Sequence, residues 1–143
     1  MSTATPGVDW GNDESTFDTL GNVSMGFDRP QITGIRVPLE HCARTVMTPI
    51  GALFYDTSKG VRVPLQTILN TTLTDAELLR VTAEYGQACA AQVAGVTRAE
   101  WRFARDGTGK IVAFSASIWL LSVGVLPLSG SAGDVLPQFK FSV

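Results

Sequence analysis

Histidine and cysteine are scarce in this sequence of 143 residues, which limits the chemistry that it can perform. His41 is the only histidine, and the two cysteines, Cys42 and Cys89, lack a C-x-x-C spacing, so no conventional cluster of metal ligands is expected. A basic excess is also missing, because 11 Lys and Arg face 13 Asp and Glu and are scattered along the chain. We therefore expect no cofactor, no bound metal and no nucleic-acid partner.

The two thiols are predicted to be buried core residues, with a disulfide or a reactive thiol as the less favoured alternatives. A surface position is expected for His41. The N-terminus has no basic region followed by an apolar run, so no secretory signal is expected and the protein is predicted to stay in the cytoplasm where it is made. The glycosylation sequons at Asn22 and Asn70 then carry no meaning.

Long hydrophobic runs are missing with one exception, the uncharged stretch of residues 111–133, which approaches the length of a membrane-spanning helix. From Val112 to Leu120 its larger apolar residues alternate with Ala, Ser and Trp, a period of two that is typical of a strand. Gly124 and Pro127 then break the run. The sequence thus favours a strand over a membrane helix.

The length is that of one ordinary domain, which can bury a core without disulfides. Residues 1–34 are rich in Gly, Asp, Asn, Ser and Thr, and their few apolar residues are too sparse for a core of their own. We predict an N-terminal arm over 1–34 that orders against something else, followed by a single domain over 35–143.

Two helices are predicted from periodicity and capping signals. Pro38 is tolerated in the first turn of a helix that must stop before Pro49. A second helix starts at the capping-box pattern Thr74 to Glu77 and runs to Gly95, a residue suited to the left-handed conformation. Gly86 weakens this helix by about 1 kcal/mol relative to Ala, which indicates a close neighbour. The expected buried positions are Leu39, Cys42, Ala43 and Val46 in the first helix, and Leu78, Val81, Tyr85, Ala88, Cys89 and Gln92 or Val93 in the second.

Beyond Gly95 the pattern changes to that of strands. Residues 96–105 place Ala, Trp and Phe on one face and charged residues on the other, and "DGTGK" joins them to the uncharged strand as a hairpin. A last strand is predicted in residues 136–143. The fold class is α+β, with two main helices packed on a small antiparallel sheet and extended N- and C-terminal arms.

The stretch "TPIGALFYDTSKG", residues 48–60, is predicted to be a structured turn that doubles as an interface. Pro49 stops the first helix, while Gly51 and Gly60 supply backbone freedom. Phe54 and Tyr55 have two interpretations. Anchoring of the loop to the core is favoured, and contact with a partner is the alternative.

The order helix, Thr-Pro-x-Gly-x-x-Phe-Tyr-Asp-x-x-x-Gly, helix and hairpin, over residues 35–122, resembles the baseplate wedge proteins of contractile-tail phages. This lysozyme-like family is related to a baseplate component of type VI secretion systems. Ile50 replaces the Arg that is typical of the family's loop. Where the family tends to carry Glu-Pro-Arg, this chain has Val96, Thr97 and Arg98. The residues that the resemblance assigns to wedge docking are Thr48, Pro49, Gly51, Phe54, Tyr55, Asp56, Gly60 and Arg98.

The resemblance implies a structural virion component that lies near the tail tube in the baseplate and nucleates sheath assembly. Its partners would be baseplate wedge proteins, the tail sheath protein and the tail tube, with several copies in the assembled ring and no contact with a membrane or nucleic acid. Localisation in the virion follows, with the host cytoplasm as the place of assembly.

The C-terminal strand is the candidate for pairing with a sheath strand, because an edge strand offers unpaired backbone groups. An ordinary edge strand of the domain is the alternative. If the strand serves as an arm, deletion of residues 139–143 is expected to leave a folded core. The candidate residues are Phe139, Lys140, Phe141, Ser142 and Val143.

A peptidoglycan-hydrolysing enzyme is the main opposing hypothesis, and a free-standing adaptor domain is the third. A muramidase needs two carboxyl groups that face each other across a cleft. Glu77 is expected to cap a helix, Glu84 to pair with Arg80, and Glu100 to pair with its neighbouring arginines. Asp56 alone stays unassigned, so no enzymatic activity is predicted.

Overall fold

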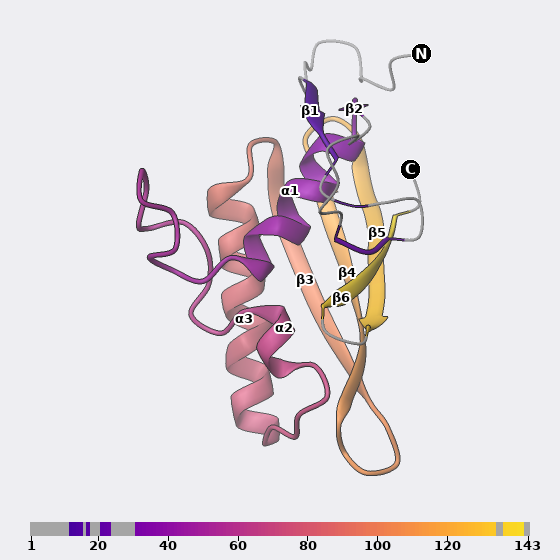
Figure 1. The fold of residues 1–143 in the computed structure, drawn as a ribbon. Coiled ribbons are helices and arrows are strands. Elements are labelled where there is room, and N and C mark those ends of the chain that lie inside the picture. Colours follow the sequence, from indigo (N-terminus) through magenta and orange to yellow (C-terminus); the bar gives the residue numbers. More distant parts are fainter. Residues whose placement is uncertain (1–11, 16, 18–20, 24–30, 134–135, 142–143) are drawn as a thin grey trace.

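The computed structural model describes residues 12–15, 17, 21–23, 31–133 and 136–141 of the chain (Figure 1). Two sheets are antiparallel: a two-stranded one and a four-stranded one with the strand order β3-β4-β5-β6. The α+β class is confirmed, and the helices lie on one face of the larger sheet. The elements in chain order are β1 (Asn12–Glu14), β2 (Gln31–Thr33), α1 (Arg36–Met47), α2 (Leu65–Ile68), α3 (Asp75–Gln92), β3 (Val96–Arg105), β4 (Ile111–Leu120), β5 (Gly124–Ala132) and β6 (Pro137–Phe141).

The bounds of helix α1 are explained by the residues at its two ends. Pro38 lies in its first turn, and the helix ends at Met47, two residues before Pro49. Thr48 adopts extended backbone at the C-cap, and its hydroxyl donates to the Arg44 carbonyl at 2.7 Å. All four predicted core positions of this helix are buried: Leu39, Cys42, Ala43 and Val46.

Helix α3 is held at its start by the predicted capping box. The Glu77 N–H donates to Thr74 Oγ1 at 3.2 Å, and the Thr74 N–H donates to Glu77 Oε1 at 3.4 Å. Gly95 does adopt a left-handed conformation, with φ of +86°, but the helix already ends at Gln92 and Gly95 turns the chain into β3. Val81, Tyr85, Ala88, Cys89 and Val93 of the predicted stripe are buried.

The close neighbour predicted for Gly86 is the backbone of β3. A Cβ added at Gly86 would lie 2.7 Å from the Ala99 carbonyl oxygen, inside van der Waals contact. The missing side chain therefore lets α3 approach the sheet closely. Trp101, two residues further along β3, meets the Tyr85 ring of α3 edge-on at 5.5 Å.

Strand β5 was not predicted, because Gly124 and Pro127 were interpreted as breakers. Pro127 instead lies within β5, opposite Ser117 of β4. The described pairing of β5 with β6 covers Leu128 to Ala132 only, so Pro127 lies beyond that ladder.

A chain of aromatic rings runs through the core from α3 to the N-terminal segment. Trp101 and Phe114 have ring centroids 6.0 Å apart, and Phe114 and Phe139 lie 5.0 Å apart. Phe17, only 1% exposed, completes the chain at 5.0 Å from Phe139. Burial of a Phe side chain contributes about 2–3 kcal/mol. Phe17, predicted to belong to an arm, is thus part of the domain's own core.

Polar contacts also join the N-terminal segment to α1. The fully buried carboxylate of Glu40 accepts from Ser15 Oγ at 3.0 and 3.1 Å and from Arg36 Nε at 2.8 Å. Asp13 contacts His41 Nε2 at 2.7 Å and Arg44 at 2.9 Å. The described residues of the predicted arm therefore order against the same chain.

Strand β6 is an edge strand of the larger sheet, as expected, but it is also part of the core. Phe139 is 2% exposed, and its N–H donates to the Gly21 carbonyl at 2.8 Å. Lys140 is exposed. Ser142 and Val143 lie outside the described residues.

Candidate functional site

Residues 48–61 form a closed loop that projects from the body of the protein between α1 and α2 (Figure 1). Its two ends are bonded: the Ile50 N–H donates to the Val61 carbonyl at 3.0 Å, and the Val61 N–H donates to the Thr48 carbonyl at 2.8 Å. Gly60 has φ of +107°, and a Cβ there would lie 2.2 Å from the Thr48 oxygen. Glycine is therefore required to close this loop.

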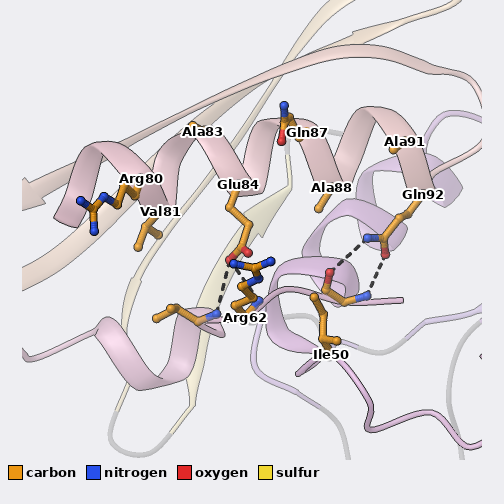
Figure 2. A pocket seen from close by; sticks show the side chains of 12 residues that line it. Ile50, Arg62, Arg80, Val81, Ala83, Glu84, Gln87, Ala88, Ala91 and Gln92 are labelled. Carbon is orange, nitrogen blue, oxygen red and sulfur yellow. Dashed lines mark hydrogen bonds between the residues drawn. The ribbon is translucent and has the colours of Figure 1, made fainter. Parts of the chain in front are cut away.

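Two side chains of α3 hold the base of the loop (Figure 2). The Gln92 amide accepts from the Gly60 N–H at 2.8 Å and donates to the Gly60 carbonyl at 3.1 Å. Glu84 Oε1 accepts from the N–H groups of Arg62 at 3.0 Å and Val63 at 3.4 Å. The expected pairing of Glu84 with Arg80 is wrong, because the carboxylate is turned toward the loop backbone instead.

Asp56 organises the tip of the loop. Its Oδ1 accepts from the Ser58 hydroxyl at 2.6 Å and from the Ser58 N–H at 3.1 Å, an Asx-turn arrangement. These bonds favour the ionised form and lower the pKa of the Asp56 carboxyl below its ordinary value. The carboxylate therefore has a local structural role in the turn.

Phe54 and Tyr55 do not anchor the loop to the core. Their exposed fractions are 93% and 72%, and the two rings contact each other edge-on with centroids 5.4 Å apart. The favoured interpretation of this pair was wrong, because Gln92 and Glu84 supply the anchoring through backbone bonds. The aromatic pair is left free for another contact.

Hollows flank the loop on two sides. One, of about 720 Å³, lies between the loop and α3, and its rim carries Ile50 and Val63, which are 47% and 38% exposed (Figure 2). The other, of about 440 Å³, is lined by Tyr55 together with Lys59 and with His41 and Arg44 of α1. The first hollow is also lined by Arg62, Arg80 and Glu84, and beside the second the Asp13 carboxylate pairs with His41 and Arg44, so both hollows combine apolar and charged groups.

Arg98 lies apart from the loop residues with which the resemblance groups it. It is on β3, its side chain is 63% exposed, and it pairs with Glu100 as predicted. Its guanidinium also stacks over the Trp119 ring, 4.8 Å from the centroid. Because its neighbour Ala99 points into the core under α3, Arg98 faces the opposite side of the sheet.

The remaining candidates for catalysis have structural partners or low reactivity. Glu77 caps α3 as expected. Cys42 and Cys89 are free and buried, which confirms the core interpretation. A hydrogen bond with Cys89, together with burial, raises the pKa of the Cys42 thiol well above its ordinary value, which disfavours the nucleophilic thiolate.

Within the described part of the chain, no three His, Cys, Asp or Glu side chains gather where a metal ion would bind. The described helices include none with the length and apolar character needed to cross a bilayer.

Comparison with known proteins gives no relative. A scan against family models finds no match, and searches of curated proteins and of solved structures also find none. The likeness to baseplate wedge proteins therefore stays a prediction from the loop and the order of elements.

Several residues that shape the site were missed by the sequence analysis. Gln92 and Glu84 hold the loop, and Phe17 and Gly21 cover β6. A signal existed for Gln92 alone, because a polar amide on a predicted buried stripe indicates a buried hydrogen bond. The others depend on segments far apart in the chain.

Proposed function

We propose that this chain is a structural component of a contractile phage tail baseplate, that it docks on wedge proteins through residues 48–60, and that it has no catalytic role. It lies near the tail tube, in several copies, and nucleates the sheath through residues 139–143. The observation that carries the docking proposal is the pair Phe54 and Tyr55, held in solvent on a loop with a hydrogen-bonded base.

The energetics favour a docking role for this pair. An exposed Phe gains about 1.5–3 kcal/mol when a partner buries it, and aromatic side chains are frequent hot spots of interfaces. The loop is ordered before binding by Gln92, Glu84 and Asp56, so little conformational entropy is lost on association. A fixed knob of this kind fits a pocket on a protein partner.

A baseplate role is favoured over a free-standing adaptor by the sequence pattern around the knob. The loop keeps seven positions of the family pattern, and α3 is followed by the expected β3–β4 hairpin, while the short helix α2 between the loop and α3 was not predicted. Two of those positions have defined roles in this loop: Gly60 closes it and Asp56 forms its turn. A muramidase role has less support, because the hydrogen-bond partners of Asp56, Glu77, Glu84 and Glu100 are all structural.

The test is the double variant Phe54→Ala/Tyr55→Ala, with Leu121→Ala as the control at another exposed apolar residue, 54% exposed. Tails assembled with each variant are imaged by negative stain, and incorporation into the baseplate is quantified. We expect the double variant to keep its melting temperature and to be lost from the baseplate, while Leu121→Ala is incorporated normally. Normal incorporation of a folded double variant would contradict the docking proposal.

A further inference from the structure

Two buried thiols meet where helix α1 packs against helix α3. Cys42 lies in the middle of α1 and Cys89 in the last turn of α3, and both residues are fully buried. The Cys89 S–H donates to the Cys42 carbonyl oxygen, with a distance of 4.0 Å between sulfur and oxygen. The two cysteines are therefore neighbours in the fold, although 47 positions separate them in the sequence.

The two sulfurs also contact each other. The Cys42 thiol forms a hydrogen bond with the Cys89 thiol, which requires the side chains to point toward one another. The adjacent residues Ala43 and Ala88 are small and buried, so the backbones of the two helices can approach closely at this point. Close approach matters because a disulfide needs Cα atoms within about 7 Å of each other.

A metal site does not explain this pair. Among the residues that the structure describes, no third His, Cys, Asp or Glu joins the two thiols in a group that could hold an ion. The chemistry available to two adjacent thiols without such a ligand is oxidation to a disulfide.

We infer that Cys42 and Cys89 form a dithiol site that a hydroperoxide converts into a disulfide between α1 and α3. With hydrogen peroxide, the thiolate of one cysteine attacks a peroxide oxygen, the O–O bond breaks, and a sulfenic acid and one water result. The other thiol then attacks the sulfenic sulfur, forms the S–S bond and displaces a second water. The two thiols lose two electrons and two protons in total, and the peroxide is reduced to two waters.

The surroundings of the pair determine the rate and the product. The hydrogen bond with Cys89 and burial raise the pKa of the Cys42 thiol, so its thiolate is scarce and the first step from this sulfur is slow. Once either sulfur is a sulfenic acid, the second thiol is already beside it, which favours condensation over further oxidation. A neutral disulfide is also tolerated in a buried site better than a charged sulfinate.

The bridge would close residues 42–89 into a covalent ring that contains the loop of residues 48–61. It would join α1, from which this loop starts, to α3, whose Gln92 holds the base of the loop. A cross-link of this kind also restricts the unfolded chain. Oxidation should therefore stabilise the fold and protect the Val61 amide, which bonds to the Thr48 carbonyl at that base. The inference goes beyond the baseplate proposal and does not depend on it.

The test compares the reduced full chain with the same chain after exposure to hydrogen peroxide under native conditions. Each sample is then unfolded, treated with N-ethylmaleimide to count the free thiols, and analysed by mass spectrometry. Cys42→Ala and Cys89→Ala are the two control variants, because each keeps one thiol and removes its partner. The melting temperature and the hydrogen exchange of the Val61 amide are measured before and after oxidation, and again after treatment with dithiothreitol.

We expect peroxide to remove about 2 Da from the wild-type chain, to leave no thiol for N-ethylmaleimide and to yield a peptide cross-linked between Cys42 and Cys89. The melting temperature should rise by about 5 °C or more, and the Val61 amide should exchange at least about threefold more slowly. Dithiothreitol should reverse both changes, and neither control variant should show them.

Two free thiols after peroxide treatment, or a sulfinic acid in place of the bridge, would overturn the inference. So would a bridge that lowers the melting temperature, because the native packing of α1 on α3 would then hold the sulfurs too far apart for a disulfide.

Discussion

Glu40 shows most directly how a single residue joins distant parts of this protein. Its carboxylate is fully buried, and it is satisfied by Arg36 one turn earlier and by Ser15 of the N-terminal segment. Burial of a charge is costly unless it is paired and hydrogen-bonded. The contact therefore favours the one arrangement in which residues 13–15 lie against α1.

The exposed Arg98 and the Arg36 that pairs with a buried carboxylate should contribute differently to the free energy of unfolding. Their Ala variants provide a test at the residue scale. Arg98→Ala should change the free energy of unfolding by about 0.5 kcal/mol or less, because its pairing with Glu100 is solvent-exposed. It should still impair wedge assembly if the resemblance is right about its role. Arg36→Ala should cost about 3 kcal/mol, since it removes the Arg36 partner of the buried Glu40 carboxylate. Urea unfolding of both variants measures the difference, and a large loss for Arg98→Ala would show that it is a structural arginine.

At the scale of elements, the contact between α3 and β3 depends on Gly86. Ala is favoured over Gly in a helix by about 1 kcal/mol, but here a Cβ would meet the Ala99 oxygen at 2.7 Å. We expect Gly86→Ala to destabilise the protein by about 1–3 kcal/mol despite its helix propensity, as overpacking does.

The control for that variant is Ala83→Gly at an exposed position of the same helix, where only propensity acts and the cost should be about 1 kcal/mol. Chemical denaturation compares the two. If Gly86→Ala were stabilising, the close approach of α3 to β3 would be wrong.

The loop of residues 48–61 is also best understood as an element. Side chains of α3 form hydrogen bonds with backbone groups at the base of the loop. The base is therefore held in one conformation while the tip stays in solvent. Such a compact loop with joined ends is typical of binding segments carried by a rigid body. The aromatic pair can therefore project without support from the core.

At the scale of the whole molecule, Phe17 from the N-terminal segment and Phe139 of β6 close one core together. Phe139 lies between Phe114 and Phe17, so β6 is a structural strand and not a removable arm. The expectation that deletion of residues 139–143 leaves a folded core is therefore revised. Loss of a buried Phe costs about 3–5 kcal/mol, a large part of the 5–15 kcal/mol that is typical of a domain.

The corresponding prediction is that deletion of residues 139–143 unfolds the protein or lowers its stability by at least about 3 kcal/mol, and that Phe139→Ala reproduces most of this loss. Lys140→Ala, at an exposed position of the same strand, should change stability by less than about 0.5 kcal/mol. Thermal and urea unfolding provide the measurement. A truncated chain with unchanged stability would show that the Phe139 cluster contributes little.

The sequence alone determined the features that depend on near neighbours. Pro49 ends α1, the Thr74 and Glu77 capping box starts α3, and the alternation in residues 96–105 predicts β3 and its buried face. Each signal acts over a few residues, through backbone geometry, a local hydrogen bond or side-chain periodicity. The close contact at Gly86 was also predictable, because a glycine inside a helix needs a packing reason.

Only the tertiary structure decided where the rest of the chain lies. Phe17 enters the core because Phe139 and Phe141, more than a hundred positions later, pack against its ring, and Pro127 is accommodated within β5 opposite Ser117 of β4. Phe54 and Tyr55 can remain exposed because Gln92 and Glu84 of α3, and not the aromatic pair, hold the loop. These outcomes depend on contacts between segments that are far apart in the sequence. The free energy of such contacts cannot be inferred from a local pattern of residues.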